Sequence, residues 1–138
     1  MIYKANKEDL NLLYQIEKEV FKDDIFSLSK AALRYHLVNN LIFIIKYQGI
    51  CVGYCLWLKR KKFYRLYSFA ILSKYQGKGL ASKLLDFSII NLKEKSLQLE
   101  VRVSNEKAIL LYEKFGFKKV KVLKDYYVSE DAYLMRRV

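Results

Sequence analysis

The chain has 138 residues, of which 53% are apolar and 15% aromatic, and a formal net charge of +12 at pH 7. This length predicts one domain over residues 1–138, and the apolar content excludes intrinsic disorder. No apolar run is long enough to cross a membrane, and the first residues lack the apolar core of a signal peptide. We therefore expect a cytoplasmic protein without membrane contact, with Cys51 and Cys55 as reduced thiols.

The positive charge favours polyanionic partners such as nucleic acid, a ribosomal particle or a phosphorylated cofactor. The lysines and arginines are spread along the chain, and their one cluster, residues 59–62, lies between two predicted strands. Such a cluster is more typical of a solvated hairpin tip than of a nucleic-acid site. Contact with nucleic acid or a ribosome therefore stays open. One histidine, His36, beside two cysteines predicts no metal site.

Apolar periodicity predicts alternating strands and helices along the whole chain. The expected strands are at 2–5, 41–47, 50–58, 63–72, 96–101, 118–123 and 131–136. The expected helices are at 6–21, 29–39, 80–92 and 104–115. Asn6 and Ser29 are placed to cap the first two helices, and Gln48-Gly49 is typical of a hairpin turn.

The resulting order is β-α-α-β-β-β-α-β-α-β-β, which predicts a mixed α/β fold. The strand at 63–72, the helix at 80–92 and the strand at 96–101 form a crossover unit, which requires a parallel pair. Hairpins on either side of this unit make the rest of the sheet antiparallel. We therefore expect a mixed, mostly antiparallel sheet flanked by helices.

Two glycines, Gly77 and Gly79, lie at the junction of a predicted strand and helix. Such a corner exposes backbone N–H groups at a helix N-terminus and favours a phosphate or pyrophosphate, although an ordinary glycine turn is also possible. A P-loop is excluded, because Leu72 and Gly79 stand where it requires glycine and Ser or Thr. A dinucleotide fold is disfavoured, because the chain offers a single βαβ unit.

The corner, Gln76-Gly77-Lys78-Gly79-Leu80-Ala81, resembles the Gln/Arg-x-x-Gly-x-Gly/Ala signature of the GNAT superfamily of N-acetyltransferases. The similarity continues through Leu99-Glu100-Val101-Arg102-Val103-Ser104-Asn105, Leu111-Tyr112-Glu113 and Gly116-Phe117. Over residues 66–135 the chain is similar to the bacterial ribosomal-protein-alanine acetyltransferase branch. The resemblance implies a GNAT fold and acetyl-CoA as cosubstrate, with no metal.

The resemblance also implies which residues hold acetyl-CoA. Backbone groups of the strand before the corner would pair with its pantetheine arm, and backbone amides of the corner would bind its pyrophosphate. The implied residues are Phe69, Ala70, Ile71, Gln76, Gly77, Lys78, Gly79, Leu80, Ala81, Ser82 and Asn105. Asn105 is also placed to cap the following helix, and the two roles are compatible.

By the same resemblance, Glu100 is the general base, directly or through a water, and Tyr112 is the acid that protonates the leaving thiolate. A backbone N–H of a bulged strand, near Ile71, would meet the oxyanion. Structural roles remain open for both side chains. Glu100 could pair with Arg102 or a lysine, and Tyr112 could be a core residue.

Phe26 and Tyr126 are expected to border the acceptor pocket, since the side chains of Tyr126 and Tyr127 point to opposite faces of a regular strand. The resemblance implies an acceptor that is a protein N-terminal α-amine, such as that of ribosomal protein S18. Alternatives are a lysine side chain, a polyamine or another small amine. A more acidic pocket would favour these, and only Asp23, Asp24, Glu130 and Asp131 could supply it. A non-catalytic acyl-CoA-binding module is a further alternative, against which the presence of both Glu100 and Tyr112 argues.

Overall fold

The computed structural model describes residues 1–25, 27–93 and 95–138, so Phe26, an expected acceptor-pocket residue, lies outside the described part. The strands are β1 (Ile2–Lys4), β2 (Leu41–Tyr47), β3 (Ile50–Lys59), β4 (Phe63–Ile71), β5 (Ser96–Arg102), β6 (Lys118–Tyr127) and β7 (Glu130–Arg137). The α-helices are α1 (Leu10–Val20), α2 (Lys30–Asn39), α3 (Leu80–Ile90) and α4 (Glu106–Lys114). Short 3-10 turns, η1 (Lys7–Asp9) and η2 (Ser73–Tyr75), precede α1 and the glycine corner.

The seven strands form one sheet in the order β1-β2-β3-β4-β5-β7-β6. The β4–β5 pair is parallel, and the other neighbouring pairs are antiparallel. The predicted fold class, a mixed and mostly antiparallel sheet flanked by helices, is therefore confirmed. Among the described residues, no helix is both long and apolar enough to cross a membrane.

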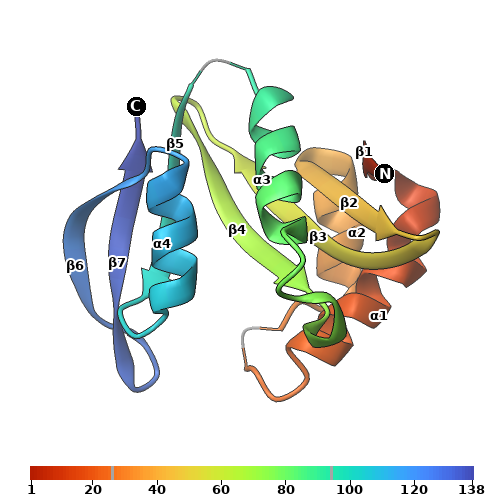
Figure 1. Cartoon of the computed structure of the whole chain (residues 1–138), viewed down its shortest axis with the longest axis horizontal. Helices are drawn as coiled ribbons and strands as arrows, with labels where there is room; N and C mark the ends of the chain where they lie inside the picture. The colour runs from red at the N-terminus through yellow and green to blue at the C-terminus, as the bar shows by residue number, and fades with distance from the viewer. Residues whose placement is uncertain (26, 94) are drawn as a thin grey trace.

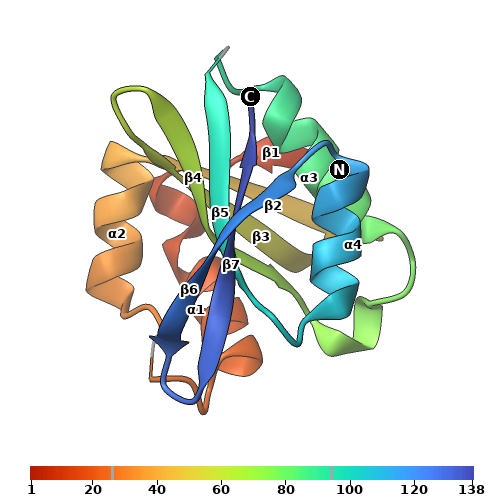
Figure 2. The same cartoon turned by 90° about the vertical axis from the view of Figure 1, so that its left-hand side faces the viewer.

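Helices cover both faces of the sheet, with α3 and α4 on one side and α1 and α2 on the other (Figure 2). Successive residues of a strand point to opposite faces, and β2 is apolar on both. Phe43 and Ile45 join the core beneath α3, whereas Ile42 and Ile44 join the core beneath α1 and α2. The continuous apolar run in β2 therefore reflects a strand that is covered by helices on both faces.

The predicted local signals are present at the element ends. The Asn6 side chain accepts a hydrogen bond from the Glu8 N–H, and the Ser29 hydroxyl accepts one from the Ala32 N–H at 3.0 Å. Gln48 and Gly49 both have positive φ, at 51° and 80°, as a two-residue hairpin turn of type I′ requires. The last two strands are longer than predicted, so that they meet at a tight turn after Tyr127.

The sheet opens between β4 and β5, which form its centre (Figure 1). The parallel ladder joins Phe63–Leu66 to Ser96–Leu99 and extends no further. The second half of β4 therefore lacks a strand partner on this side. A β-bulge in β4 coincides with the end of the ladder. In β3, Leu56 pairs with Ser68 and Trp57 pairs with Leu66, so Tyr67 is the extra residue of β4 without a partner in β3.

Candidate active site

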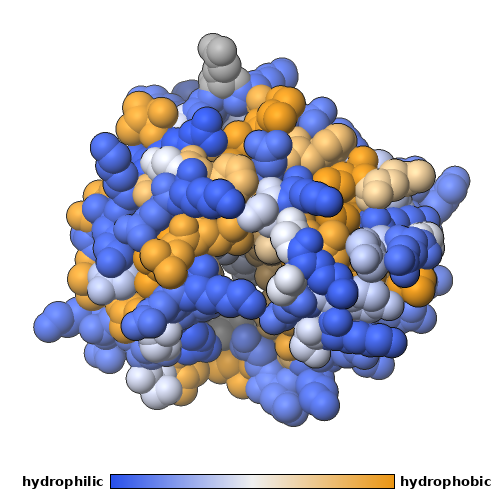
Figure 3. Space-filling view, viewed as in Figure 1, coloured by the Kyte–Doolittle hydropathy of each residue, from blue (hydrophilic) through white to orange (hydrophobic). Residues whose placement is uncertain are grey.

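A cleft of about 610 Å³ begins where β4 and β5 separate. The face viewed in Figure 1 is hollowed near its centre, with both hydrophilic and hydrophobic side chains around the opening (Figure 3). The lining comes from α1 and the segment after it, β4, β5, α4 and the end of β6. Its polar residues are Glu17, Asp24, Arg65, Tyr67, Ser68, Glu100, Arg102, Asn105, Tyr112, Tyr126 and Tyr127.

Glu100 lies in the cleft wall on β5 and is paired with Arg65 of β4. The Arg65 Nε donates to Glu100 Oε1 at 2.7 Å, and the carboxylate side chain is only 8% exposed. Burial lowers the pKa of the Arg65 guanidinium, but the charge and hydrogen bond of Glu100, together with two nearby tyrosines, outweigh burial and raise that pKa. Arg102, the partner considered from the sequence, instead faces Glu130 at 3.5 Å. In the described chain, Glu100 Oε2 has no hydrogen-bond partner, and it is open to the cleft.

Tyr112 lies on α4 and is 9% exposed. Its ring packs edge-on against Phe69 and Phe117, with ring centroids 6.4 and 6.0 Å away. Burial, followed by the proximity of Tyr127, raises the pKa of Tyr112, so the phenol stays protonated at neutral pH. Tyr112 is thus a core residue that also reaches the cleft, and the two interpretations do not exclude each other.

Tyr126 and Tyr127 both line the cleft, although in a regular strand their side chains would point to opposite faces. Their rings are in edge-on contact at 5.0 Å. The strand is irregular here, since the β6–β7 register shifts between Leu123 and Tyr127. Asp125 has a positive φ of 53°, and its N–H donates to Asp131 Oδ1. This irregularity removes the alternation of side chains between faces.

The glycine corner lies between η2 and α3. Gly77 and Gly79 have φ values of 80° and 76°, which favour glycine, and a Cβ atom added at either would meet no neighbour within 4 Å. Glycine is therefore required here by backbone conformation rather than by crowding. Gly79 is the N-cap residue of α3 without a side-chain cap, and the first N–H groups of a helix lack intrahelical acceptors. The Gln76 side chain donates to the Ile71 carbonyl at 3.0 Å and ties the corner to β4.

The predicted residues fall into two groups. Phe69, Glu100, Asn105, Tyr112 and Tyr126 come together in the lining of the cleft. The corner residues and the buried Ala70 and Ile71 are not in this lining, and in β4 the bulge is at Tyr67 instead of near Ile71.

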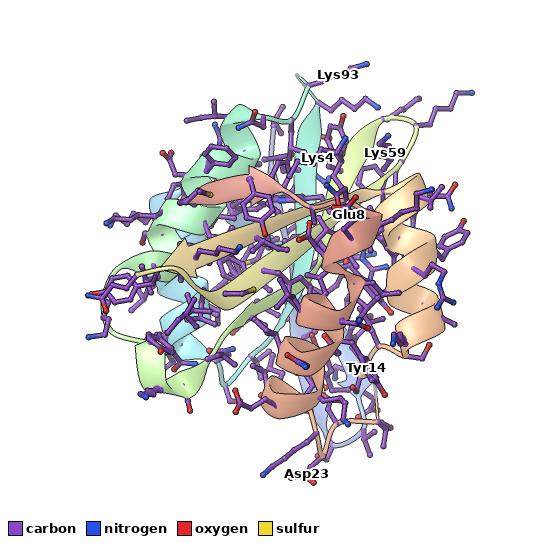
Figure 4. All side chains as sticks on the ribbon, turned by 90° about the vertical axis from the view of Figure 1, so that its right-hand side faces the viewer. Lys4, Glu8, Tyr14, Asp23, Lys59 and Lys93 are labelled. Carbon is purple, nitrogen blue, oxygen red and sulfur yellow. The ribbon has the colours of Figure 1, made fainter. Side chains whose placement is uncertain are left out.

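Of the four acidic residues considered for an acidic pocket, Asp24 lines the cleft, whereas Asp23, Glu130 and Asp131 do not. Asp23 points away from the molecule beyond the end of α1 (Figure 4).

A buried carboxylate, Glu17, was missed by the sequence analysis. It lies on α1 within the core, 1% exposed, and also lines the cleft. Its Oε2 accepts from the Leu28 N–H at 2.7 Å, and its Oε1 accepts a short hydrogen bond from the Tyr54 hydroxyl. The Tyr54 hydroxyl also contacts Ser68 Oγ at 3.0 Å. Glu17 therefore connects the segment after α1 to the centre of the sheet.

Replacing Glu17 with alanine is expected to lower the free energy of unfolding by about 2–4 kcal/mol, because two buried donors would lose their acceptor. Urea denaturation measures this change. Glu19→Ala is the matched control, since Glu19 is exposed on the same helix, and should change stability by less than about 0.5 kcal/mol. Equal effects of the two variants would contradict the assignment of Glu17.

Residues 8–117 match the model of the acetyltransferase (GNAT) family. The chain belongs to this family. Its members use acetyl-CoA, and the resemblance inferred from the glycine corner is confirmed.

Two similar GNAT relatives are described as N-alpha-acetyltransferases. The protein from Sulfolobus acidocaldarius is 32% identical over 97% of this chain and 96% of its own length. The protein from Saccharolobus solfataricus is 55% identical, but the match spans 51% of this chain and 45% of that protein. Among solved structures, the ribosomal-protein-S18-alanine N-acetyltransferase from Escherichia coli aligns with a TM-score of 0.88 and 28% identity, covering 99% of this chain and 92% of that one.

Proposed function

We propose that this protein transfers the acetyl group of acetyl-CoA to the α-amine of a protein N-terminus. One observation carries the proposal. The opening between β4 and β5 leads to a cleft in which the Glu100 carboxyl group and a protonated phenol, Tyr112, both line the wall. The relatives described as N-alpha-acetyltransferases support this acceptor class.

The chain fits acetyl-CoA in three places. The second half of β4 has unpaired backbone on the side of β5, which suits a pantetheine arm that pairs as an added strand. Phe69, Ala70 and Ile71 lie in this half. The amides from Gly77 to Ser82 suit the pyrophosphate, because a helix N-terminus favours anions. Asn105 caps α4 by accepting from the Ala108 N–H at 3.2 Å, and it also borders the cleft.

When bound, acetyl-CoA supplies an acetyl thioester at the inner end of the cleft. In this proposal Glu100 takes a proton from the acceptor amine through its open Oε2, directly or through a water. Tyr112 donates its hydroxyl proton to the departing thiolate, since the phenol is protonated at neutral pH. Tyr126 borders the acceptor's path, and its hydroxyl is fixed by Arg65 at 2.7 Å.

An α-amine suits this site better than a lysine side chain does. A free α-amine has a pKa of about 7.7–8.0, against about 10.4 for lysine, so a single carboxylate suffices as base at neutral pH. Of the three carboxylates in the cleft, Glu17 is buried with both oxygens bonded and Glu100 is balanced by Arg65. Two of the three carboxylates are therefore already occupied by protein groups, which favours an acceptor with one amine over a polyamine.

Acetyl-CoA turnover with a panel of acceptors tests the proposal, with release of the thiol as the signal. The panel should contain N-terminal peptides, peptides with blocked α-amines and a free lysine, and polyamines. We expect thiol release with free N-terminal peptides. Faster turnover of the blocked lysine peptides or of the polyamines would show that the acceptor is a lysine side chain or a small amine instead. Absence of thiol release with every acceptor, despite acetyl-CoA binding, would reject catalysis.

A further inference from the structure

Arg65 lines the cleft and has no proton-transfer role in the proposed mechanism, yet it contacts both Glu100 and Tyr126. Its Nε donates to Glu100, and its terminal nitrogen donates to the Tyr126 hydroxyl, each at 2.7 Å. Its guanidinium carbon also lies 5.3 Å from the centre of the Tyr67 ring. Three contacts hold this cation between the proposed base and the proposed acceptor-pocket wall.

Two of the other charged residues of the cleft, Glu17 and Arg102, have protein partners of their own. Glu17 accepts two hydrogen bonds within the core. Arg102 stacks on the Tyr127 ring at 4.1 Å and faces Glu130. Arg65 is therefore the cation that balances Glu100 at the acceptor end of the cleft.

We propose that Arg65 is a specificity-determining residue that keeps this site from selecting acceptors with a second positive charge close to the reacting amine. This inference rests on the proposed function. With Arg65 in place, an approaching acceptor meets a neutral pair. Without it, the same acceptor would meet the uncompensated carboxylate of Glu100, which attracts cations in a partly buried site. With the pair intact, the site therefore gains no preference for an N-terminus that is followed by a basic residue.

Peptide binding to the protein saturated with CoA tests the charge preference without turnover. Two peptides that differ only at the second residue, Ser-Lys and Ser-Glu, are titrated calorimetrically. Arg65→Gln is expected to raise the affinity for the Ser-Lys peptide relative to the Ser-Glu peptide by about tenfold at low salt, and less at high salt. Arg65→Lys keeps the charge and should leave the ratio within about twofold of the original.

Glu100→Gln supplies a second, opposite test. It preserves the shape of the side chain but leaves the Arg65 charge unbalanced, so the ratio should move by about tenfold toward the Ser-Glu peptide. An unchanged ratio in both neutral variants, or an equal change in Arg65→Lys, overturns the inference. Failure of the proposed function is measured separately, as the absence of acetyl transfer by the unmodified protein. If neither peptide binds, both the proposed function and the role of Arg65 are overturned.

Discussion

Replacing Tyr112 with phenylalanine is expected to lower kcat by about 10²-fold while acetyl-CoA affinity stays within about twofold. The variant removes one hydroxyl and keeps the ring that packs between Phe69 and Phe117. A proton donor to the thiolate acts only in the transition state, so its loss appears in kcat and not in ground-state binding. Steady-state thiol release and calorimetric titration of acetyl-CoA measure the two quantities.

Tyr64→Phe is the matched control for this experiment. Tyr64 is also a buried core tyrosine, 4% exposed, but it lies outside the cleft lining. Its variant should keep kcat within about twofold. Unchanged turnover in Tyr112→Phe would make Tyr112 a packing residue alone. An equal loss in both variants would point to a general effect of core hydroxyls.

Replacing Glu100 with glutamine is expected to lower kcat/KM for an N-terminal peptide by about 10²-fold at pH 7. The amide cannot accept the amine's proton, although it keeps the side-chain shape. The loss should shrink as pH rises above about 8, because the free α-amine then deprotonates in solution and needs less help from a base. A pH series of thiol-release rates from pH 6.5 to 9 measures this recovery.

Glu130→Gln is the control, because Glu130 pairs with Arg102 but does not line the cleft. Hydrogen bonds from Ser104, followed by the charge of Arg102, lower the pKa of Glu130, so its role is that of an anionic partner. Its variant should retain kcat/KM within about threefold. A loss in Glu100→Gln that is equally large at every pH would argue against base catalysis by Glu100.

The arrangement of the elements could be predicted because each carries its own periodic signal. In β5 the buried residues Leu97, Leu99 and Val101 alternate with polar ones, which places Glu100 on the opposite face without knowledge of the fold. In α4, Ile109 and Tyr112 share the apolar stripe that packs on the sheet. These residues are positioned by local geometry, so the sequence alone could place Glu100 and Tyr112 on their faces, and both line the cleft.

The partner of Glu100 could not be predicted in the same way. Arg65 and Glu100 lie on different strands, and their contact depends on the register of the parallel pair, which joins Arg65 to Gln98 and Leu66 to Leu99. Register arises from packing between distant segments and leaves little trace in either strand alone. The available signal was a charged residue at the third position of an otherwise largely apolar strand.

Two other features depended on departures from regular structure. Tyr126 and Tyr127 face one cleft because the end of β6 is irregular around Asp125, and a sequence pattern assumes regular pleating. Glu17 stands among apolar residues on α1 and is stabilised there by donors from β3 and from the segment before α2. Only the tertiary structure brings these donors to it.

The incomplete ladder between β4 and β5 has a thermodynamic consequence for the protein in a cell. A cosubstrate that pairs with the free half of β4 completes the sheet, so its binding free energy also becomes resistance to unfolding. By mass-action linkage, acetyl-CoA at about one hundred times its Kd would add about 2.7 kcal/mol to stability. The melting temperature should rise with acetyl-CoA concentration, and the lifetime of the protein would then follow the supply of its own acetyl donor.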